Sequence, residues 1–196
     1  MTSLRHNVSP DDTYLDAARD AILAVGWTRT TLTDVARRAG VSRMTIYRRW
    51  PDMRSLLGDL MTREWSTIGD EGLPTRGSTR SRVAAGAAAM VRSLRDNELF
   101  TKILQVDPEL LLPYLLERRG RTQDALLTLL TAGITEGQRD GTIREGNATV
   151  LARSVLLAAH GFALSASTMT GTDRGEPGLR RLDAELTDLV DRYLAP

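Results

Sequence analysis

The stretch TLTDVARRAGVSRMTIYRRWPDMRSLL, residues 31–57, contains two short helix patterns separated by a glycine. Thr31 is a favourable N-cap for the first helix, and Asp34 stands three residues later in a variant of the capping box. Gly40 can adopt the positive φ that ends a helix, and Ser42 can cap the helix that follows. Two short helices joined by a tight glycine-containing turn predict a helix-turn-helix unit.

The second of these helices, residues 43–50, has two different faces. At about 100° per residue, Ile46 and Trp50 point into a small core, and Met44 and Arg48 fall on the opposite side. Residues near the start of such a helix commonly reach the edges of DNA bases. The outward-facing or flanking residues are Arg43, Met44, Thr45, Tyr47 and Arg48.

These side chains match the chemistry of a DNA groove and its phosphates. Arginine can pair with two acceptors on guanine, and threonine and tyrosine hydroxyls commonly bind phosphate oxygens. The N-terminus of the first helix adds amide donors near Thr31 and Thr33. We therefore interpret the second helix as a recognition helix for the major groove, with an affinity that falls steeply with salt. The predicted DNA contacts are Thr31, Thr33, Ser42, Arg43, Met44, Thr45, Tyr47, Arg48, Arg49 and Arg54.

Positive charge is concentrated around the same stretch. Residues 29–54 contain seven arginines and two acids, a formal charge of +5, whereas the whole chain carries +1. The remainder of the chain therefore sums to −4. A local basic segment on a mildly acidic chain indicates an anionic partner, although a solvated charged face would have the same composition.

Other residue types exclude several kinds of site. The chain has no cysteine, so a disulfide, a thiolate metal site and a catalytic thiol are all excluded. The two histidines, His6 and His160, lie far apart, and we expect neither a metal site nor a cofactor. The apolar runs are short and interrupted, so we expect no transmembrane helix, no secretory signal and a cytoplasmic location.

Helical periodicity extends over nearly the whole chain, and it predicts an all-α fold. Glycine, proline and serine mark a loop at residues 70–81. Gly120 and Gly133 lie inside the longest predicted helix and weaken the prediction of one straight rod. The expected helices are residues 11–26, 32–39, 43–50, 52–69, 82–95, 98–106, 108–140, 147–169 and 179–194.

Residues 31–57 resemble the DNA-binding motif of the tetracycline-repressor (TetR) family of bacterial regulators. That motif combines a threonine-capped helix with an aliphatic residue and alanine, a Gly-Val-Ser turn, an aliphatic residue with tyrosine, and a further aromatic residue. The combination is specific, whereas Gly-Val-Ser alone would be weak. The matching residues are Thr31, Val35, Ala36, Gly40, Val41, Ser42, Ile46, Tyr47 and Trp50.

The resemblance implies two domains. A three-helix DNA-binding domain would occupy residues 1–54, with a tail at 1–10, and a helical ligand-binding and dimerisation domain would occupy residues 55–196. The resemblance further implies a homodimer that binds a palindromic operator on double-stranded DNA, in the family's usual mode a repressor. A small-molecule effector would release it from the DNA.

One position departs from the family pattern. The lysine that usually opens the fourth helix and binds a phosphate is replaced by Met53 in this chain. Arg49 or Arg54 would have to bind that phosphate instead, and a weaker affinity for DNA is the alternative.

The middle helices carry apolar candidates for an effector pocket. Most of them are expected to be core residues individually, but together they indicate a mainly apolar effector. His160 could anchor a polar end of that effector, although a histidine satisfied within the core is the commoner case. Asn97, Gln105 and Asp107 could add polar contacts or could cap helices. The candidate pocket residues are Met61, Trp65, Met90, Leu94, Phe100, Leu104, Tyr114, Leu127, His160 and Phe162.

The last two helices carry an apolar stripe. On a monomer it would expose a large apolar surface, unless the same chain covers it, and a two-fold interface would bury it. With the family resemblance we favour the interface. The predicted interface residues are Leu151, Val155, Ala159, Leu182, Leu186, Leu189 and Tyr193.

Two other classes of protein remain open at this level. One is a small-molecule-binding helical protein or enzyme without operator-specific DNA binding, although no nucleophile motif or telling pair of carboxylates is visible. Asp183 and Glu185 on the last helix are interpreted as a solvated face. The other class is a nonspecific DNA-compacting protein, which the modest net charge disfavours.

Overall fold

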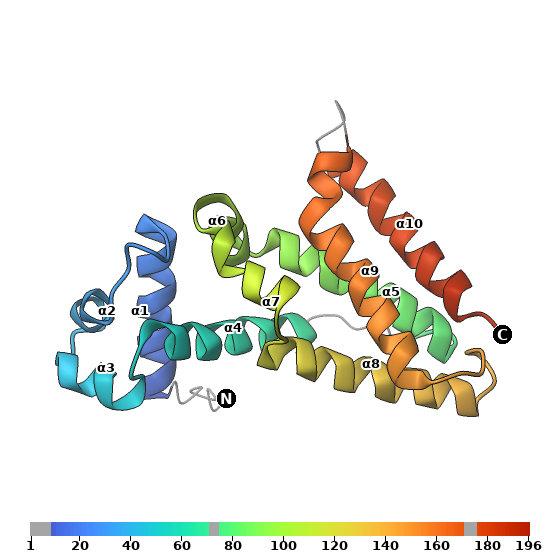
Figure 1. The fold of residues 1–196 in the computed structure, drawn as a ribbon, viewed down its shortest axis with the longest axis horizontal. Helices are drawn as coiled ribbons and strands as arrows, with labels where there is room; N and C mark the ends of the chain where they lie inside the picture. Colours follow the sequence, from blue (N-terminus) through green and yellow to red (C-terminus); the bar gives the residue numbers. More distant parts are fainter. Residues whose placement is uncertain (1–8, 71–74, 171–175) are drawn as a thin grey trace, which may run out of the picture. The chain divides into compact units, whose positions relative to one another are not determined.

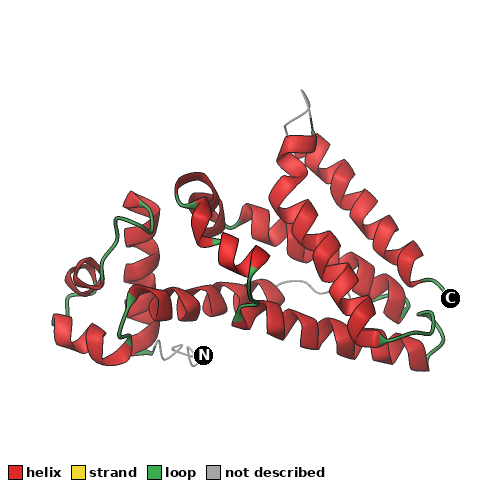
Figure 2. Ribbon diagram, in the orientation of Figure 1, coloured by secondary structure: helices red, strands yellow, loops and turns green. Residues whose placement is uncertain are grey.

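The computed structural model describes residues 9–70, 75–170 and 176–196, without the side chains of residues 65–70, 176 and 177. These residues form helices, and no strand is found among them (Figure 1, Figure 2). The predicted all-α fold is therefore confirmed. The helices are α1 (Pro10–Val25), α2 (Leu32–Arg38), α3 (Arg43–Arg49), α4 (Met53–Asp70), α5 (Thr79–Asp96), α6 (Glu98–Val106), the 3-10 helix η1 (Pro108–Leu110), α7 (Leu112–Leu116), α8 (Arg121–Arg139), α9 (Ala148–Met169) and α10 (Glu176–Leu194).

The chain forms two compact units that alternate along the sequence. The first contains Met1–Glu64 and Glu98–Arg118, and the second contains Trp65–Asn97 and Arg119–Pro196. The first unit thus extends beyond the helix-turn-helix, because α6 contacts α1. The domain boundary between residues 54 and 55 stays a prediction.

The first unit has one apolar core. Ile22, Val35 and Ile46, from α1, α2 and α3, are fully buried in it together with Trp50. The Trp50 ring meets Tyr14 edge to face, with their centroids 6.3 Å apart. Burial of an aromatic side chain of this size is a major stabilising contribution to a small core.

Three polar contacts anchor α4 within the same unit. The indole Nε1 of Trp50 donates to Oδ2 of Asp59 at 2.8 Å, so its buried donor is satisfied. Arg63 donates to the backbone oxygen of Asp12 and pairs with Asp16, both at 2.9 Å. These contacts attach α4 to α3 and to the N-terminal part of α1.

In the second unit α5 contacts α8, α9 and α10. Its buried residues include the small Ala84, Gly86 and Ala88, which allow close approach of the neighbouring helices. Leu186, Val190 and Leu194 of α10 are fully buried. The spacing of these three residues is the helical repeat of a single buried stripe.

The structure corrects the assignment of Asp183 to a solvated face. Only 3% of Asp183 is exposed, and it pairs with Arg95 of α5. Glu185, two residues further along, is exposed as predicted. The sequence could not separate the two acids, because the partner of Asp183 lies far away in the chain.

The long helix predicted for residues 108–140 is wrong, because the chain forms η1, α7 and α8 there. Gly120 is the N-cap of α8 in an extended conformation, and its amide donates to Oε1 of Gln123 at 2.8 Å. Gly133, by contrast, stays inside α8. A Cβ at that position would approach Cγ2 of Val83 to 3.2 Å, so the glycine permits close packing of α8 on α5.

Candidate nucleic-acid interface

Local hydrogen bonds build the helix-turn-helix as the sequence predicts. The Thr31 hydroxyl accepts from the Asp34 amide at 3.2 Å, and the Asp34 carboxylate accepts from the Thr31 amide at 3.2 Å, which completes a capping box. Gly40 has a φ of +68°, and the Val41 amide donates to the Ala36 carbonyl at 3.0 Å across the turn. Ser42 then caps α3 by accepting from the Thr45 amide.

The outer face of α3 is exposed and the inner face is buried. Met44 is 75% exposed and Tyr47 is 46% exposed, whereas Ile46 is fully buried. Arg43 and Arg48 are exposed as well. A helix with two arginines, a tyrosine and a methionine on its exposed face offers donors and an apolar contact for a groove of DNA.

The predicted hydroxyl contacts differ in their local bonding. The Thr31 hydroxyl donates to Asp34 at 2.6 Å, and the Ser42 and Thr45 hydroxyls lie 2.9 Å apart and bond to each other. Thr33 is exposed at the start of α2. Three of the five predicted hydroxyls therefore already take part in bonds at the N-termini of α2 and α3.

Arg49, Met53 and Arg54, at or just after the end of α3, also differ in their surroundings. Arg49 donates to Asp11 at 2.8 Å and lies 5.4 Å from the centroid of the Trp50 ring. Arg49 thus stabilises the DNA-binding head, by which we mean α1, α2 and α3. Arg54 is exposed. Met53 is partly buried and packs against the core of the first unit.

Asp107 at the end of α6 has a role that sequence reasoning left open. It is 3% exposed, and it accepts from the Trp27 amide at 2.7 Å, from the Thr28 amide at 3.2 Å and from the Thr28 hydroxyl. The Asp107 side chain makes no capping hydrogen bond to η1, the helix that it precedes, and instead binds the turn between α1 and α2. An Asp-Pro pair after an apolar helix was the available signal in the sequence.

Gly26 allows this contact to form. Its φ is +89°, and a Cβ there would come within 2.9 Å of both Asp107 Oδ2 and Val106 Cγ1. Burial of the Asp107 carboxyl alone would raise its pKa, but the hydrogen bonds from Thr28 and Trp27 outweigh burial and lower the pKa. The carboxylate is therefore ionised at neutral pH and binds the turn as an anion.

The predicted pocket residues are divided between the two units. Met61, Phe100, Leu104 and Tyr114 belong to the first, and Met90, Leu94, Leu127, His160 and Phe162 belong to the second. The backbone of Trp65 belongs to the second unit, and its side chain lies outside the described residues. Burial of the imidazole lowers the pKa of His160. His160 is not among the lining residues of the two cavities that are described next.

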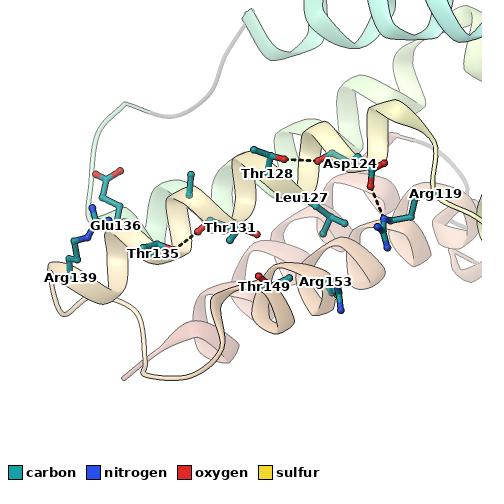
Figure 3. Close-up of a pocket in the computed structure, with 11 residues that line it drawn as sticks. Arg119, Asp124, Leu127, Thr128, Thr131, Thr135, Glu136, Arg139, Thr149 and Arg153 are labelled. Carbon is teal, nitrogen blue, oxygen red and sulfur yellow. Dashed lines mark hydrogen bonds and ion pairs between the residues drawn. The ribbon is translucent and has the colours of Figure 1, made fainter.

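The larger of these cavities is a polar groove of about 790 Å³ between α8 and α9 (Figure 3). Leu127 is its one member from the predicted pocket. Most of its lining residues are threonines or charged residues, and Arg119 donates to Asp124 at 2.7 Å. The lining residues are Arg119, Asp124, Leu127, Thr128, Thr131, Ala132, Thr135, Glu136, Arg139, Thr149 and Arg153.

The smaller cavity, about 290 Å³, lies among α5, α8 and α9 and includes Met90 from the predicted pocket. Its walls are mainly apolar, with Arg82, Thr79 and Glu136 as its polar members. We call it the inner cavity. Its remaining lining residues are Val83, Gly86, Ala87, Leu126, Leu129, Leu130, Gly133, Val155, Leu156 and Ala159.

The predicted interface residues separate into two groups. Leu151, Val155 and Leu186 are buried inside their own chain, so the assignment of these three side chains to a subunit interface is corrected. Leu189 and Tyr193 are exposed, and Ala159 and Leu182 are intermediate. Leu157, which the sequence pattern did not single out, is 70% exposed on α9.

One described helix, α9, is long and apolar enough to cross a membrane, with a mean hydropathy of 1.4. It contacts α5, α8 and α10, and its buried residues include Leu151, Ala152 and Val155. Core helices of soluble proteins satisfy the same criteria of length and composition. Among the residues described, no group of three or more acids and histidines is placed to hold a metal ion.

Comparison with known proteins agrees with this geometry. Residues 15–60 match the family of bacterial regulatory proteins described as the tetR family. An uncharacterized HTH-type transcriptional regulator of Mycobacterium bovis is 38% identical over 182 residues, which is 92% of each chain. The HTH-type transcriptional regulator AlkX of Mycobacterium tuberculosis is 49% identical over 45 residues, or 23% of this chain and 21% of its own.

Solved structures share the fold over nearly the whole chain. A tetR-family transcription regulator from Shewanella sp. PV-4 superposes with a TM-score of 0.64 at 18% identity, over 96% of this chain and 99% of its own. A transcriptional regulator from Saccharomonospora viridis in complex with choline gives 0.65 at 19% identity, over 95% and 97%. The family match and the mycobacterial relative, 38% identical over 92% of each chain, show that the chain is a DNA-binding transcriptional regulator of the TetR family.

Proposed function

We propose that this regulator is a dimeric repressor that binds a palindromic operator and that a mainly apolar small molecule releases from the DNA. The observation that carries the proposal is the exposed outer face of α3, with Arg43, Met44, Tyr47 and Arg48. Arg43 and Arg48 would contact base edges or phosphates in the major groove, and Tyr47 would bind a phosphate. The protein would act in the cytoplasm, where the DNA is.

The other DNA contacts are assigned by their local bonding. Thr33 and Arg54 are exposed and suited to phosphate, and Arg54 takes the place of the family's lysine because Met53 packs against the core. Thr31, Ser42 and Thr45 would contact the backbone while they cap their helices. Arg49 would contribute a phosphate contact only if it exchanged its bond with Asp11.

The homodimer is supported by apolar side chains that their own chain leaves uncovered. Leu157 on α9 and Leu189 and Tyr193 on α10 are exposed, and Ala159 and Leu182 are only partly covered. A second copy of this chain can cover such a surface in a two-fold interface. Two heads would then read half-sites about 34–36 Å apart, or a multiple of that spacing.

The effector site is proposed in the inner cavity. Its walls are mainly apolar, whereas the groove between α8 and α9 is lined mainly by exposed polar and charged residues. Pockets for small molecules are usually apolar with few polar groups. An effector could release the DNA only through a different affinity for the bound and free arrangements of the dimer.

Two helices, α4 and α6, could transmit an effector-induced change to the DNA-binding head. Helix α4 continues from the first unit into the second, with Glu64 in one and Trp65 in the other. In the first unit, α6 contacts α1, and Asp107 binds the turn that precedes α2. A shift of α4 or α6 would therefore alter the orientation of the recognition helix.

The test is binding of the purified protein to DNA from just upstream of its own gene, compared with random DNA, at low and physiological salt. We expect specific binding with a steep salt slope, because phosphate contacts release counterions. Equal, weak binding to both DNAs would contradict operator recognition at that site, and random fragments of the genome would then be selected for binding.

A further inference from the structure

The inner cavity is long, because it follows the line along which α5 and α8 pack against each other. Neighbours across this line show that the two helices run antiparallel. The neighbouring pairs are Thr79 with Asp140, Arg82 with Glu136 and Val83 with Gly133. The lining forms one stripe on each helix, from Thr79 to Met90 on α5 and from Leu126 to Glu136 on α8. At 1.5 Å per residue, each stripe is about 15–17 Å long.

The cavity is also narrow. Its volume of about 290 Å³ lies at the low end for small-molecule pockets, which usually measure about 300–1,000 Å³. The small residues Gly86, Ala87 and Gly133 line its middle part. There α5 and α8 are so close that a Cβ added to Gly133 would approach Cγ2 of Val83 to 3.2 Å. A small volume spread over this length has room for an extended chain and excludes a fused ring system.

The wall beyond one end of the cavity is entirely apolar. Among the described lining residues, only Thr79, Arg82 and Glu136 have polar side chains, and all three lie at the same end. Arg82 and Glu136 pair with each other at 2.9 Å. A polar group in the middle of a ligand would lose its water there without gaining a hydrogen-bond partner. The body of the ligand must therefore be hydrocarbon.

Part of this apolar wall is in contact with water. Leu129 of α8 lines the cavity and is 51% exposed, whereas Val155 and Leu156 of α9 on the same cavity are buried. A hydrocarbon chain in the cavity would cover Leu129 and would itself leave water, and both changes are favourable.

We propose that the inner cavity binds an unbranched aliphatic chain of about twelve carbons in an extended conformation. Carbon–carbon bonds of about 1.5 Å at near-tetrahedral angles advance a chain by about 1.25 Å per carbon, so about twelve carbons match the length of the stripes. The inference rests on the proposed function in treating this cavity as the effector site. It narrows the effector from an apolar molecule to a linear one.

The experiment measures binding of straight-chain alcohols to the full-length protein by equilibrium dialysis. The probes are hexan-1-ol, octan-1-ol, decan-1-ol, dodecan-1-ol and tetradecan-1-ol. Affinity should rise about fourfold with each added carbon, because each methylene removes more apolar surface from water, and it should level off near dodecan-1-ol, where the cavity is filled. A rise that continues unchanged to tetradecan-1-ol would indicate nonspecific partitioning and would overturn the proposal, as would no binding of any alcohol.

The shape requirement is tested with cyclododecanol, which has the same carbon count and hydroxyl group as dodecan-1-ol but a wide ring. It should bind at least roughly tenfold more weakly, because a ring of this width cannot enter without forcing the helices apart. Equal or tighter binding of cyclododecanol would contradict a linear ligand.

Two variants should move the preferred chain length in opposite directions. Ala87→Leu obstructs the middle of the cavity, so affinity should level off near octan-1-ol, whereas Met90→Ala opens one end, so affinity should rise further to tetradecan-1-ol. Ala132→Leu enlarges an exposed residue of α8 outside this cavity and should leave the series unchanged. An unchanged series in Met90→Ala, with helical circular dichroism equal to that of the parent, would contradict the placement of the chain.

Operator release is measured separately with dodecan-1-ol. If dodecan-1-ol binds with the expected length dependence but leaves the protein on its DNA, the ligand class stands and the proposed release mechanism fails. If a cyclic compound releases the DNA while none of the alcohols binds, the ligand class fails and the proposed function stands.

Discussion

Arg43 and Tyr47 of α3 can make different kinds of contact with DNA, although they are only four residues apart. Arg43 stands at the N-terminal end of the helix, where base edges are within reach, and its guanidinium can satisfy two acceptors. Tyr47 has one hydroxyl, suited to a phosphate oxygen. At the scale of residues, specificity and affinity should therefore be separable.

Arg43→Ala should cost about 1–3 kcal/mol of binding free energy on the operator and far less on random DNA, because a lost base contact relaxes specificity. Tyr47→Ala should weaken both DNAs by a similar factor, because a phosphate contact carries no sequence information. Competition binding at one fixed salt concentration measures both. Arg92→Ala is the control, and losses for Arg43→Ala that are equal on the two DNAs would remove Arg43 from base reading.

Asp107 provides a second prediction at this scale. Asp107→Ala removes the acceptor of three hydrogen bonds and should lower the free energy of unfolding by about 3 kcal/mol. Chemical denaturation measures the loss, and the exposed Glu109→Ala is the matched control. A loss no larger than that of the control would show that the cap does not stabilise the head.

The same group predicts a pH dependence. The folded-state pKa of Asp107 lies below its ordinary value of 3.8, so the native protein binds its proton less readily than the unfolded chain does. Its contribution is complete above that ordinary value and is lost as the pH falls through the lower, folded-state pKa. The difference in stability between the parent and Asp107→Ala should therefore shrink in this acid range.

Helix boundaries and helix contacts follow different physical rules at the scale of elements. Gly120 ends one helix pattern and begins another, whereas Gly133 and Gly137 remain inside α8. At Gly137 a Cβ would lie 2.5 Å from Cγ1 and 3.1 Å from Cβ of Ile143, a side chain that is itself buried. The glycine is required there because α8 and the turn that follows it are in close contact.

Gly137→Ala should therefore lower the free energy of unfolding by about 1–3 kcal/mol through overpacking, although alanine is the better helix former. Thr128→Ala on the exposed side of α8 is the control and should change stability by less than about 0.5 kcal/mol. Urea denaturation compares the two. A Gly137→Ala protein more stable than the parent would mean that Ile143 moves aside freely.

For the whole molecule, the question is which apolar surface a second copy covers. The stripe seen in the sequence contains residues that serve the chain's own core, and the exposed apolar side chains of the last two helices include Leu157 of α9 and Leu189 and Tyr193 of α10. Periodicity identifies an apolar face, but it does not say whether the chain or a partner covers it.

Leu157→Asp should shift the protein from dimer to monomer at micromolar concentration, because the interface would have to bury an unpaired carboxylate. Sedimentation equilibrium measures the mass, against 21.6 kDa for one chain. Leu116→Asp, a leucine of similar exposure in the first unit, is the control. A parent protein that is itself monomeric would contradict the interface, and so would dissociation by both variants.

The sequence by itself determined the features that depend on neighbours along the chain. Thr31 with Asp34, Gly40 and Ser42 defined the helix-turn-helix, because caps and turns involve residues only a few positions apart. The tertiary structure decided what depends on distant partners. It buried Asp183 against Arg95, packed Met53 on the core, and placed Asp107 on the turn at Trp27. Burial and pairing across such distances set the energy of a polar group, and no local pattern records them.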